Sequence, residues 1–155
     1  MQASIENFLH HRSPYLQVDE LIESSSSHIH TKKVITDSEF YINGHFPGAP
    51  VVPGAMMQEM CTQSAGILIA QHYNPMSNFN TKDPFHNEMA LGVLRSISNA
   101  KFYSFVKVGD VLDIHIRLIN NLDNLYKFEG KIFNKDKKIM RIAFSLCNTQ
   151  SELLY

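Results

Sequence analysis

The chain has 155 residues, of which 44% are hydrophobic and 19% are charged, and its formal net charge is -1. This length and composition predict one globular domain with a real core and exclude an intrinsically disordered chain. The near-neutral charge and the lack of a Lys/Arg-rich run argue against a protein that binds nucleic acid or an anionic membrane surface.

Three features predict a soluble protein of a reducing compartment, which we expect to be the cytoplasm. The N-terminal residues lack a positively charged region followed by an apolar stretch, so we expect no secretory signal. No apolar run approaches the roughly 20 residues that a bilayer span requires. Cys61 and Cys147 are the only cysteines, and two reduced, largely buried thiols are a better interpretation than a disulfide.

The first part of the chain predicts short elements. Residues 5–9 are expected to form a short helix, and residues 16–22 and 31–36 are expected to be strands. Four consecutive serines at positions 24–27 predict a solvated turn between these strands.

Residues 44–54, with the sequence GHFPGAPVVPG, form the most informative segment. Prolines recur at every third position as Pro47, Pro50 and Pro53. Each proline fixes its own φ and disfavours the helical region for the residue before it, so the segment is expected to be stiff and extended. His45 lies at its start, and a helix is expected directly after it.

That helix is predicted over residues 53–72, because proline suits a first turn and the residues that follow are apolar around most of the circumference. A helix of this kind is surrounded by protein. Ala65 and Gly66 would allow another element to approach closely. Glu59 is the one acidic residue of this helix.

The second half of the chain predicts the sheet that covers the helix. After an irregular loop over residues 73–88, one long strand is expected over residues 90–105. Alternating or strand-like patterns follow over residues 112–118, 126–132 and 140–146. We therefore expect an α+β fold: one buried helix, then a four-strand meander, with the early strands completing a curved antiparallel sheet wrapped around the helix.

The residue types around the proline segment suit proton transfer next to a carbonyl group. An imidazole titrates near neutrality, and burial can raise the pKa of a carboxylic acid such as Glu59. The first backbone N–H groups of the helix, at Gly54 and Ala55, are expected to be free donors at a partly positive helix end. No histidine pair has ligand spacing backed by a third ligand, so a metal site is not expected.

Four segments in order resemble the FabZ family of 3-hydroxyacyl-acyl-carrier-protein dehydratases, which have the hotdog fold. Residues 11–19 match the family pattern H-R-x-P-F-L-x-V-D, and residues 44–54 match G-H-F-P-G-x-P-x-x-P-G. Glu59 and Gln63 stand where the family has its catalytic acid and a following glutamine. Residues 100–110 match a strand-turn pattern of the same family. The resemblance covers about residues 9–147 and implies a single hotdog domain over residues 1–155.

The resemblance implies roles for these residues in the dehydration of 3-hydroxyacyl thioesters to trans-2-enoyl thioesters, within fatty-acid or related acyl-chain biosynthesis. His45 would take the proton from C2, and Glu59 would protonate the departing hydroxyl group or position the water that does. The backbone of Gly54 and Ala55 would hold the thioester oxygen. Supporting positions are Gln63, Phe46 and Pro53.

The resemblance also implies partners. The acyl group would arrive on the phosphopantetheine arm of acyl carrier protein, with no metal or redox cofactor. The site would lie at a two-fold homodimer interface, with His45 from one subunit and Glu59 from the other, and trimers of such dimers occur in the family. The sequence also departs from the family pattern. Ser96 is found where the family usually has a glycine, and Phe40 is found at a position often held by proline. The loop over residues 74–89 is longer than is usual in the family.

Two other functions remain open from the sequence. A hotdog acyl thioesterase would commonly use a helix carboxylate and water without the histidine, so His45 argues against it. A non-catalytic module that binds acyl carrier protein has no physical reason to keep an imidazole beside a buried acid, so His45 and Glu59 together argue against that.

Overall fold

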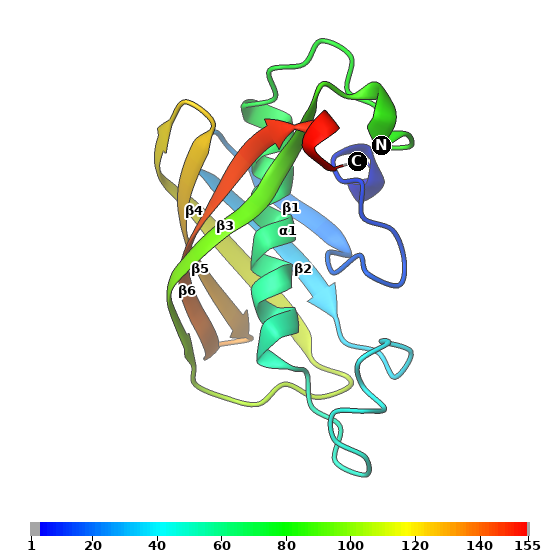
Figure 1. Cartoon of the computed structure of the whole chain (residues 1–155). Helices are drawn as coiled ribbons and strands as arrows, with labels where there is room; N and C mark the ends of the chain where they lie inside the picture. The colour runs from blue at the N-terminus through cyan, green and yellow to red at the C-terminus, as the bar shows by residue number, and fades with distance from the viewer. Residues whose placement is uncertain (1–3, 155) are drawn as a thin grey trace.

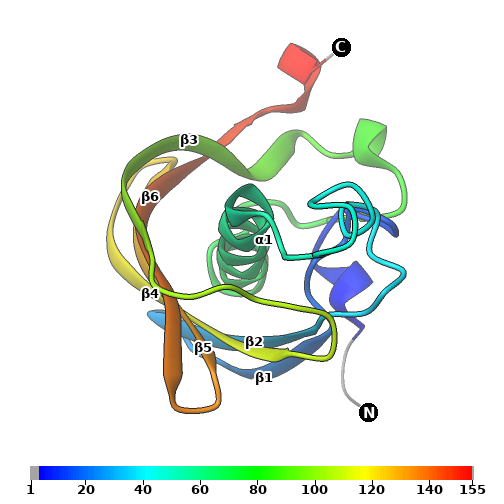
Figure 2. The ribbon, with the colours of Figure 1, turned by 90° about the horizontal axis from the view of Figure 1, so that it is seen from below.

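The helix α1 (Gly54–His72) runs through the middle of the molecule, and an antiparallel sheet curves around it (Figure 1). Seen along the helix axis, the sheet encloses α1 on two sides (Figure 2). This structure is a computed structural model that describes residues 4–154; residues 1–3, at the start of the N-terminal segment considered above, and residue 155 lie outside it. The expected α+β arrangement is confirmed.

Six strands form the sheet in the order β1-β2-β4-β5-β6-β3. Their bounds are β1 (Glu20–Ser24), β2 (His28–Val34), β3 (Met89–Phe102), β4 (Val111–Leu122), β5 (Leu125–Asn134) and β6 (Lys137–Gln150). Strands β4, β5 and β6 follow one another through tight turns, as expected. The predicted four-strand meander is wrong in one respect, because β3 pairs with β6 rather than with β4. Such a pairing brings together segments far apart in the chain, and the local pattern of a strand does not reveal its partner.

The early strands lie at shifted positions. The strand expected from residue 16 begins only at Glu20, because the backbone N–H of Gln17 donates to the side chain of Gln63 on α1 instead of to a neighbouring strand. The second strand begins earlier than predicted, at His28, and ends at Val34. The serine turn between them is confirmed, with the N–H of Ser25 donating to the carbonyl of His28 (2.7 Å).

The core surrounds α1 as the sequence predicted. Side chains from Met57 to Ile69 are buried on nearly every side of the helix. On β3, Gly92 adopts a φ of +70°, and a Cβ atom there would lie 3.1 Å from the Cα of Gly66. The two glycines therefore allow α1 and β3 to make the close approach that the small residues of the helix indicated.

The cysteine prediction is also confirmed. Both cysteines are free, Cys61 fully buried in α1 and Cys147 partly buried in β6. Burial raises the pKa of the Cys61 thiol well above its ordinary value, so this thiol stays protonated.

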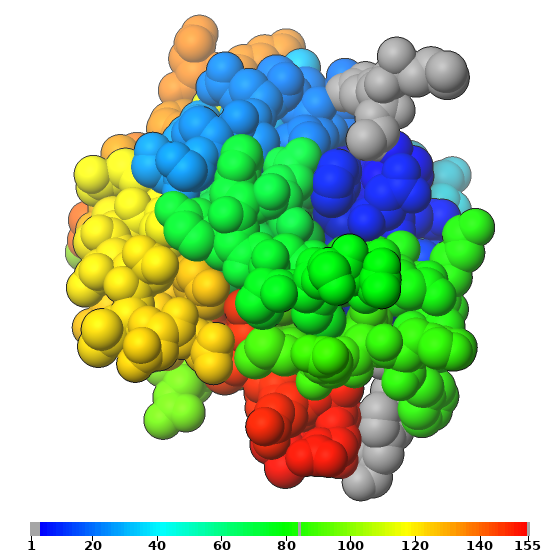
Figure 3. Space-filling view, turned by 90° about the horizontal axis from the view of Figure 1, so that it is seen from above, coloured from blue at the N-terminus to red at the C-terminus, as the bar shows by residue number. Residues whose placement is uncertain are grey.

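The loop after α1 packs against the N-terminal segment. The short helices η1 (Ile5–Asn7), η2 (Pro84–His86) and η3 (Ser151–Leu154) all lie at this end of the molecule (Figure 3). His10 donates through Nδ1 to the carbonyl of Thr81 (3.1 Å) and accepts at Nε2 from Asn87 (3.1 Å). The long loop is thus fastened to the residues that precede the first strand. Within residues 4–154, no helix is both long and apolar enough to cross a bilayer.

Candidate active site

The proline segment is a turn followed by a short extended stretch, so the expectation of an extended strap throughout was wrong. Residues 46–49 close a tight turn, with reciprocal hydrogen bonds between the backbones of Phe46 and Ala49 (2.9 and 3.3 Å). Pro47 and Gly48 stand at its centre, and Gly48 has a φ of +78°. A proline followed by a glycine with positive φ is the preferred centre of a type II turn, which explains the difference.

This turn fixes the position of His45. The N–H of Val51 donates to the His45 carbonyl (2.8 Å), and Nδ1 of the imidazole lies 3.0 Å from the Val51 carbonyl oxygen. A carbonyl oxygen can only accept, so Nδ1 carries the proton and Nε2 of the neutral ring has a free lone pair. The ring also stacks on Phe46, with 4.3 Å between centroids. The His45 ring is therefore fixed in position with Nε2 available to accept a proton.

The start of α1 presents free backbone donors. Pro53 is the N-cap residue, and its carbonyl accepts from the N–H groups of Met56 and Met57. The N–H groups of Gly54 and Ala55 precede any acceptor within the helix. A Cβ atom at Gly54 would lie 3.0 Å from the ring of Phe102 at the end of β3. Gly54 therefore leaves room for this aromatic ring at the helix start, as only a residue without a side chain can.

Glu59 lies in the second turn of α1 and is held by a short network. Its Oε1 accepts from Nε2 of Gln63 (2.9 Å), which also donates to the carbonyl of Tyr15 (2.9 Å). Oε1 of Gln63 accepts from the N–H of Gln17 (2.7 Å). Gln63 thus fastens the acid to the segment that precedes the first strand, which is the geometry of a supporting residue.

Burial raises the pKa of Glu59, and hydrogen bonds from Gln63 and Tyr15 offset part of that effect. The carboxyl group therefore keeps its proton to higher pH than an exposed glutamate. This is the direction that a general acid needs, because it must hold a proton to give away.

His11 and Tyr15 complete the surroundings of Glu59. Nε2 of His11 lies 3.7 Å from Oε1 of Glu59, and the hydroxyl of Tyr15 hydrogen-bonds the same carboxyl group. Burial, together with His10 and Arg12, lowers the pKa of His11, so this imidazole is neutral at pH 7. The sequence motif at residues 11–19 contains His11 and Tyr15, but its spacing did not indicate that either residue lies beside Glu59.

A cavity of about 400 Å³ opens beside Glu59. Its walls come from the N-terminal segment, α1, β3 and η3, and they include Thr62, Gly66, Gly92, Leu94 and Leu154. A second cavity, of about 660 Å³, lies at the proline segment and is lined by Phe46, Val51, Phe105 and their neighbours. Across residues 4–154 of one chain, no hydrogen bond, ion pair or ring contact joins His45 to Glu59. Glu59 lines the first cavity, and the residues that follow His45 line the second.

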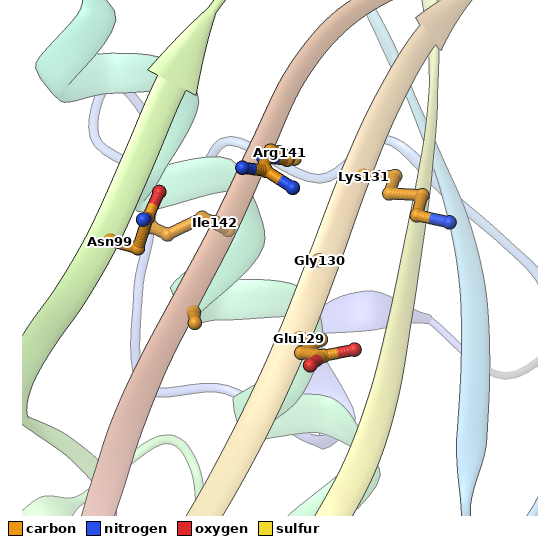
Figure 4. A pocket seen from close by; sticks show the side chains of 7 residues that line it. Asn99, Glu129, Gly130, Lys131, Arg141 and Ile142 are labelled. Atoms are coloured by element: carbon orange, nitrogen blue, oxygen red, sulfur yellow. The ribbon is translucent and has the colours of Figure 1, made fainter.

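A third depression, of about 390 Å³, lies on the face of the sheet that points away from α1. Asn99, Arg141, Lys131 and Glu129 surround it on three neighbouring strands, with the helix behind the sheet (Figure 4). The sheet separates it from Glu59, so it is not part of this site. No group of three or more His, Cys, Asp or Glu side chains that could hold a metal occurs in the part of the chain that the structure describes.

Comparison with known proteins identifies the family. A FabA-like domain model matches residues 9–143. The chain belongs to the FabA-like domain family. Curated relatives of this FabA-like protein include the 3-hydroxyacyl-[acyl-carrier-protein] dehydratases FabZ of Thiobacillus denitrificans, 33% identical over 82% of both chains, and of Fusobacterium nucleatum, 33% identical over 87% of both. The family resemblance inferred from the sequence is thereby confirmed.

Solved structures confirm the hotdog fold of this FabA-like chain. The dehydratase heterocomplex ApeI:P from Xenorhabdus doucetiae matches with a TM-score of 0.76 at 20% identity, covering 99% of this chain and 97% of that one. The protein smu.793 from Streptococcus mutans, bound to acetyl CoA, matches with a TM-score of 0.63 at 15% identity, covering 93% and 98%. At these identities the likeness concerns the fold alone.

Proposed function

We propose that the chain is a 3-hydroxyacyl-[acyl-carrier-protein] dehydratase, a hydro-lyase that converts 3-hydroxyacyl thioesters to trans-2-enoyl thioesters in fatty-acid or related acyl-chain biosynthesis. The observation that carries this proposal is the fixed His45 ring, whose Nδ1 hydrogen bond to Val51 leaves Nε2 free as a base. The FabZ relatives, at 30% identity or more over most of the chain, support the same reaction.

The reaction needs two proton transfers, and in this proposal His45 and Glu59 each carry out one of them. Nε2 of His45 removes a proton from C2 of the substrate, and the N–H groups at Gly54 and Ala55 stabilise the negative charge that develops on the thioester oxygen. The protonated carboxyl of Glu59 then gives its proton to the C3 hydroxyl group, which leaves as water. The C3–O bond breaks and the C2=C3 double bond forms. No electron is gained or lost, so the reaction requires no redox cofactor.

A second subunit completes the site in this proposal. Strand β3 lies at the edge of the sheet, is 14 residues long and exposes the apolar side chains Val93, Leu94, Ile97 and Phe102. A long, partly apolar edge strand pairs readily with another strand. A two-fold pairing of β3 with β3 in a second copy would bring His45 of one subunit toward the Glu59 cavity of the other. Acyl carrier protein would deliver the substrate to this interface.

The direct test is an assay of the purified protein with a 3-hydroxyacyl thioester of acyl carrier protein or of a pantetheine analogue. We expect an enoyl thioester and no free thiol, and a loss of about 10²–10⁴-fold in rate for His45→Ala. Release of free thiol without enoyl product would instead establish a thioesterase. Binding of acyl carrier protein without any turnover would establish a non-catalytic carrier-binding module.

A further inference from the structure

Tyr15 is a close neighbour of the proposed acid. Tyr15 lies in the N-terminal segment and carries a hydroxyl group. That hydroxyl hydrogen-bonds the carboxyl group of Glu59. Both residues line the same cavity of about 400 Å³.

The ring of Tyr15 stacks on two aromatic neighbours. It stacks on His11, with 5.9 Å between centroids and 20° between planes, and on Phe40, with 6.2 Å and 26°. Phe40 in turn packs edge-on against Tyr41 at 5.2 Å. Tyr15 is 46% exposed in one chain, so its ring could otherwise rotate. The two stacking contacts restrict that rotation.

The backbone of Tyr15 is fixed as well. Its carbonyl accepts from Nε2 of Gln63, the same group that donates to Glu59. On the other side, the hydroxyl of Tyr41 donates to Oε1 of Gln17 (3.2 Å), whose N–H donates to Gln63. Glu59 is therefore held from two sides, by Gln63 along the helix and by the Tyr15 hydroxyl across the cavity.

We propose that Tyr15 is a positioning residue for Glu59: its hydroxyl group, held by ring stacking between His11 and Phe40, fixes the orientation of the carboxyl group toward the substrate. This inference rests on the proposed function, because it assigns Tyr15 an effect on the proton that Glu59 delivers. A fixed carboxyl group loses less freedom when the substrate arrives, and the rate gain appears in kcat.

The electrostatic surroundings of Glu59 provide a measurable quantity, the pKa of its carboxyl group. A purely structural role of Tyr15 would not change that pKa. The titratable groups that face Glu59 in one chain are His11, His10 and Tyr15, all from the N-terminal segment. Arg12 is turned toward backbone carbonyls of Leu9, His11 and Thr81 and toward Glu6. The Tyr15 hydrogen bond lowers the pKa of Glu59 against the larger effect of burial. Removing the hydroxyl therefore raises that pKa further.

The test is the Tyr15→Phe variant, assayed for kcat and KM across pH. Because Glu59 acts in its protonated form, activity is lost as pH rises through its pKa. The variant should lose roughly tenfold in kcat, equivalent to about 1.4 kcal/mol, with little change in KM, and the alkaline limb of its pH profile should move to higher pH. Tyr73→Phe is the matched control, because the Tyr73 hydroxyl also donates a hydrogen bond (2.7 Å, to the Ser26 carbonyl) but lies at the far end of α1.

A second variant, Phe40→Leu, keeps the hydroxyl and removes one face of the stack. It should lose less in kcat than Tyr15→Phe and leave the alkaline limb near its original position. An unchanged kcat and pH profile for Tyr15→Phe, or a limb that moves to lower pH, would overturn the inference while the wild-type protein remained an active dehydratase. An inactive wild-type protein would count against the proposed function instead.

Discussion

At the residue scale, the proposed site depends on two side chains that are held in position in different ways. His45 is fixed by a hydrogen bond to the backbone of Val51, just after the turn, so local geometry sets which ring nitrogen is free to accept. Glu59 is fixed by residues from a distant segment and is tuned by burial, which raises its pKa. A base left free to accept and an acid kept protonated are the combination that elimination of water requires.

Glu59→Gln should strongly reduce activity and stabilise the protein at neutral pH. The raised pKa means that the folded state holds a proton that the unfolded state releases as pH rises above the ordinary value of 4.5. The free energy of unfolding therefore falls as pH rises from that value through the raised pKa. Glutamine carries no charge to bury, so the variant should escape this loss, while the rate should fall by about 10²–10⁴-fold.

Denaturation of both proteins as a function of pH measures this effect. Wild type and variant should differ most above the raised pKa and converge below pH 4.5. Glu129→Gln is the control, since Glu129 is an exposed side chain paired with Arg117 (2.9 Å) and should change stability by less than about 1 kcal/mol. A Glu59→Gln protein that is less stable than wild type at neutral pH would show that the acid is a structural ion partner.

At the element scale, α1 and β3 form the frame of the Glu59 cavity. Their close approach at Gly66 and Gly92 places Leu94 and the other cavity residues of β3 beside the acid. The sequence predicted the helix well, because an apolar circumference and a proline at its start are local signals. It could not predict that β3 pairs with β6 or that residues 16–19 leave the sheet, because both depend on contacts between distant segments.

Gly92→Ala should destabilise the fold and damage the cavity. The residue has a φ of +70°, and a Cβ atom there would lie 3.1 Å from the backbone of Gly66, which cannot move aside without shifting α1. We expect a loss of about 1–3 kcal/mol in the free energy of unfolding, measured by chemical denaturation. Gly44→Ala is the matched control, because nothing lies within 4 Å of its added Cβ. Equal stability of Gly92→Ala and wild type would contradict the close packing of α1 and β3.

The candidate site shows the same division between local and distant signals. The sequence indicated His45, Gly54 and Glu59 because each stands in or next to one compact motif. The surroundings of Glu59 were not predicted, since His11 and Tyr15 reach it only after the N-terminal segment has folded against α1. The proline segment was expected to be extended, but the Pro47–Gly48 pair favours a turn over an extended strand, and this turn is what pairs His45 with Val51.

At the scale of the whole molecule, the proposed function needs a second subunit. Within residues 4–154 of one chain, His45 and Glu59 lie in separate surroundings, and β3 leaves a long edge with exposed apolar side chains. The proposed function therefore depends on a two-fold pairing that brings each His45 to the Glu59 cavity of the other subunit. It also predicts that a single subunit without a partner is inactive, however well it folds.

Coexpression of His45→Ala and Glu59→Gln subunits tests this central claim most directly. Each variant alone should be inactive, and random pairing should give half mixed dimers, each with one intact site. The mixture should therefore recover about one quarter of the wild-type dehydratase activity. If mixed dimers form and no activity returns, His45 and Glu59 do not act together across a subunit interface, and the account is contradicted.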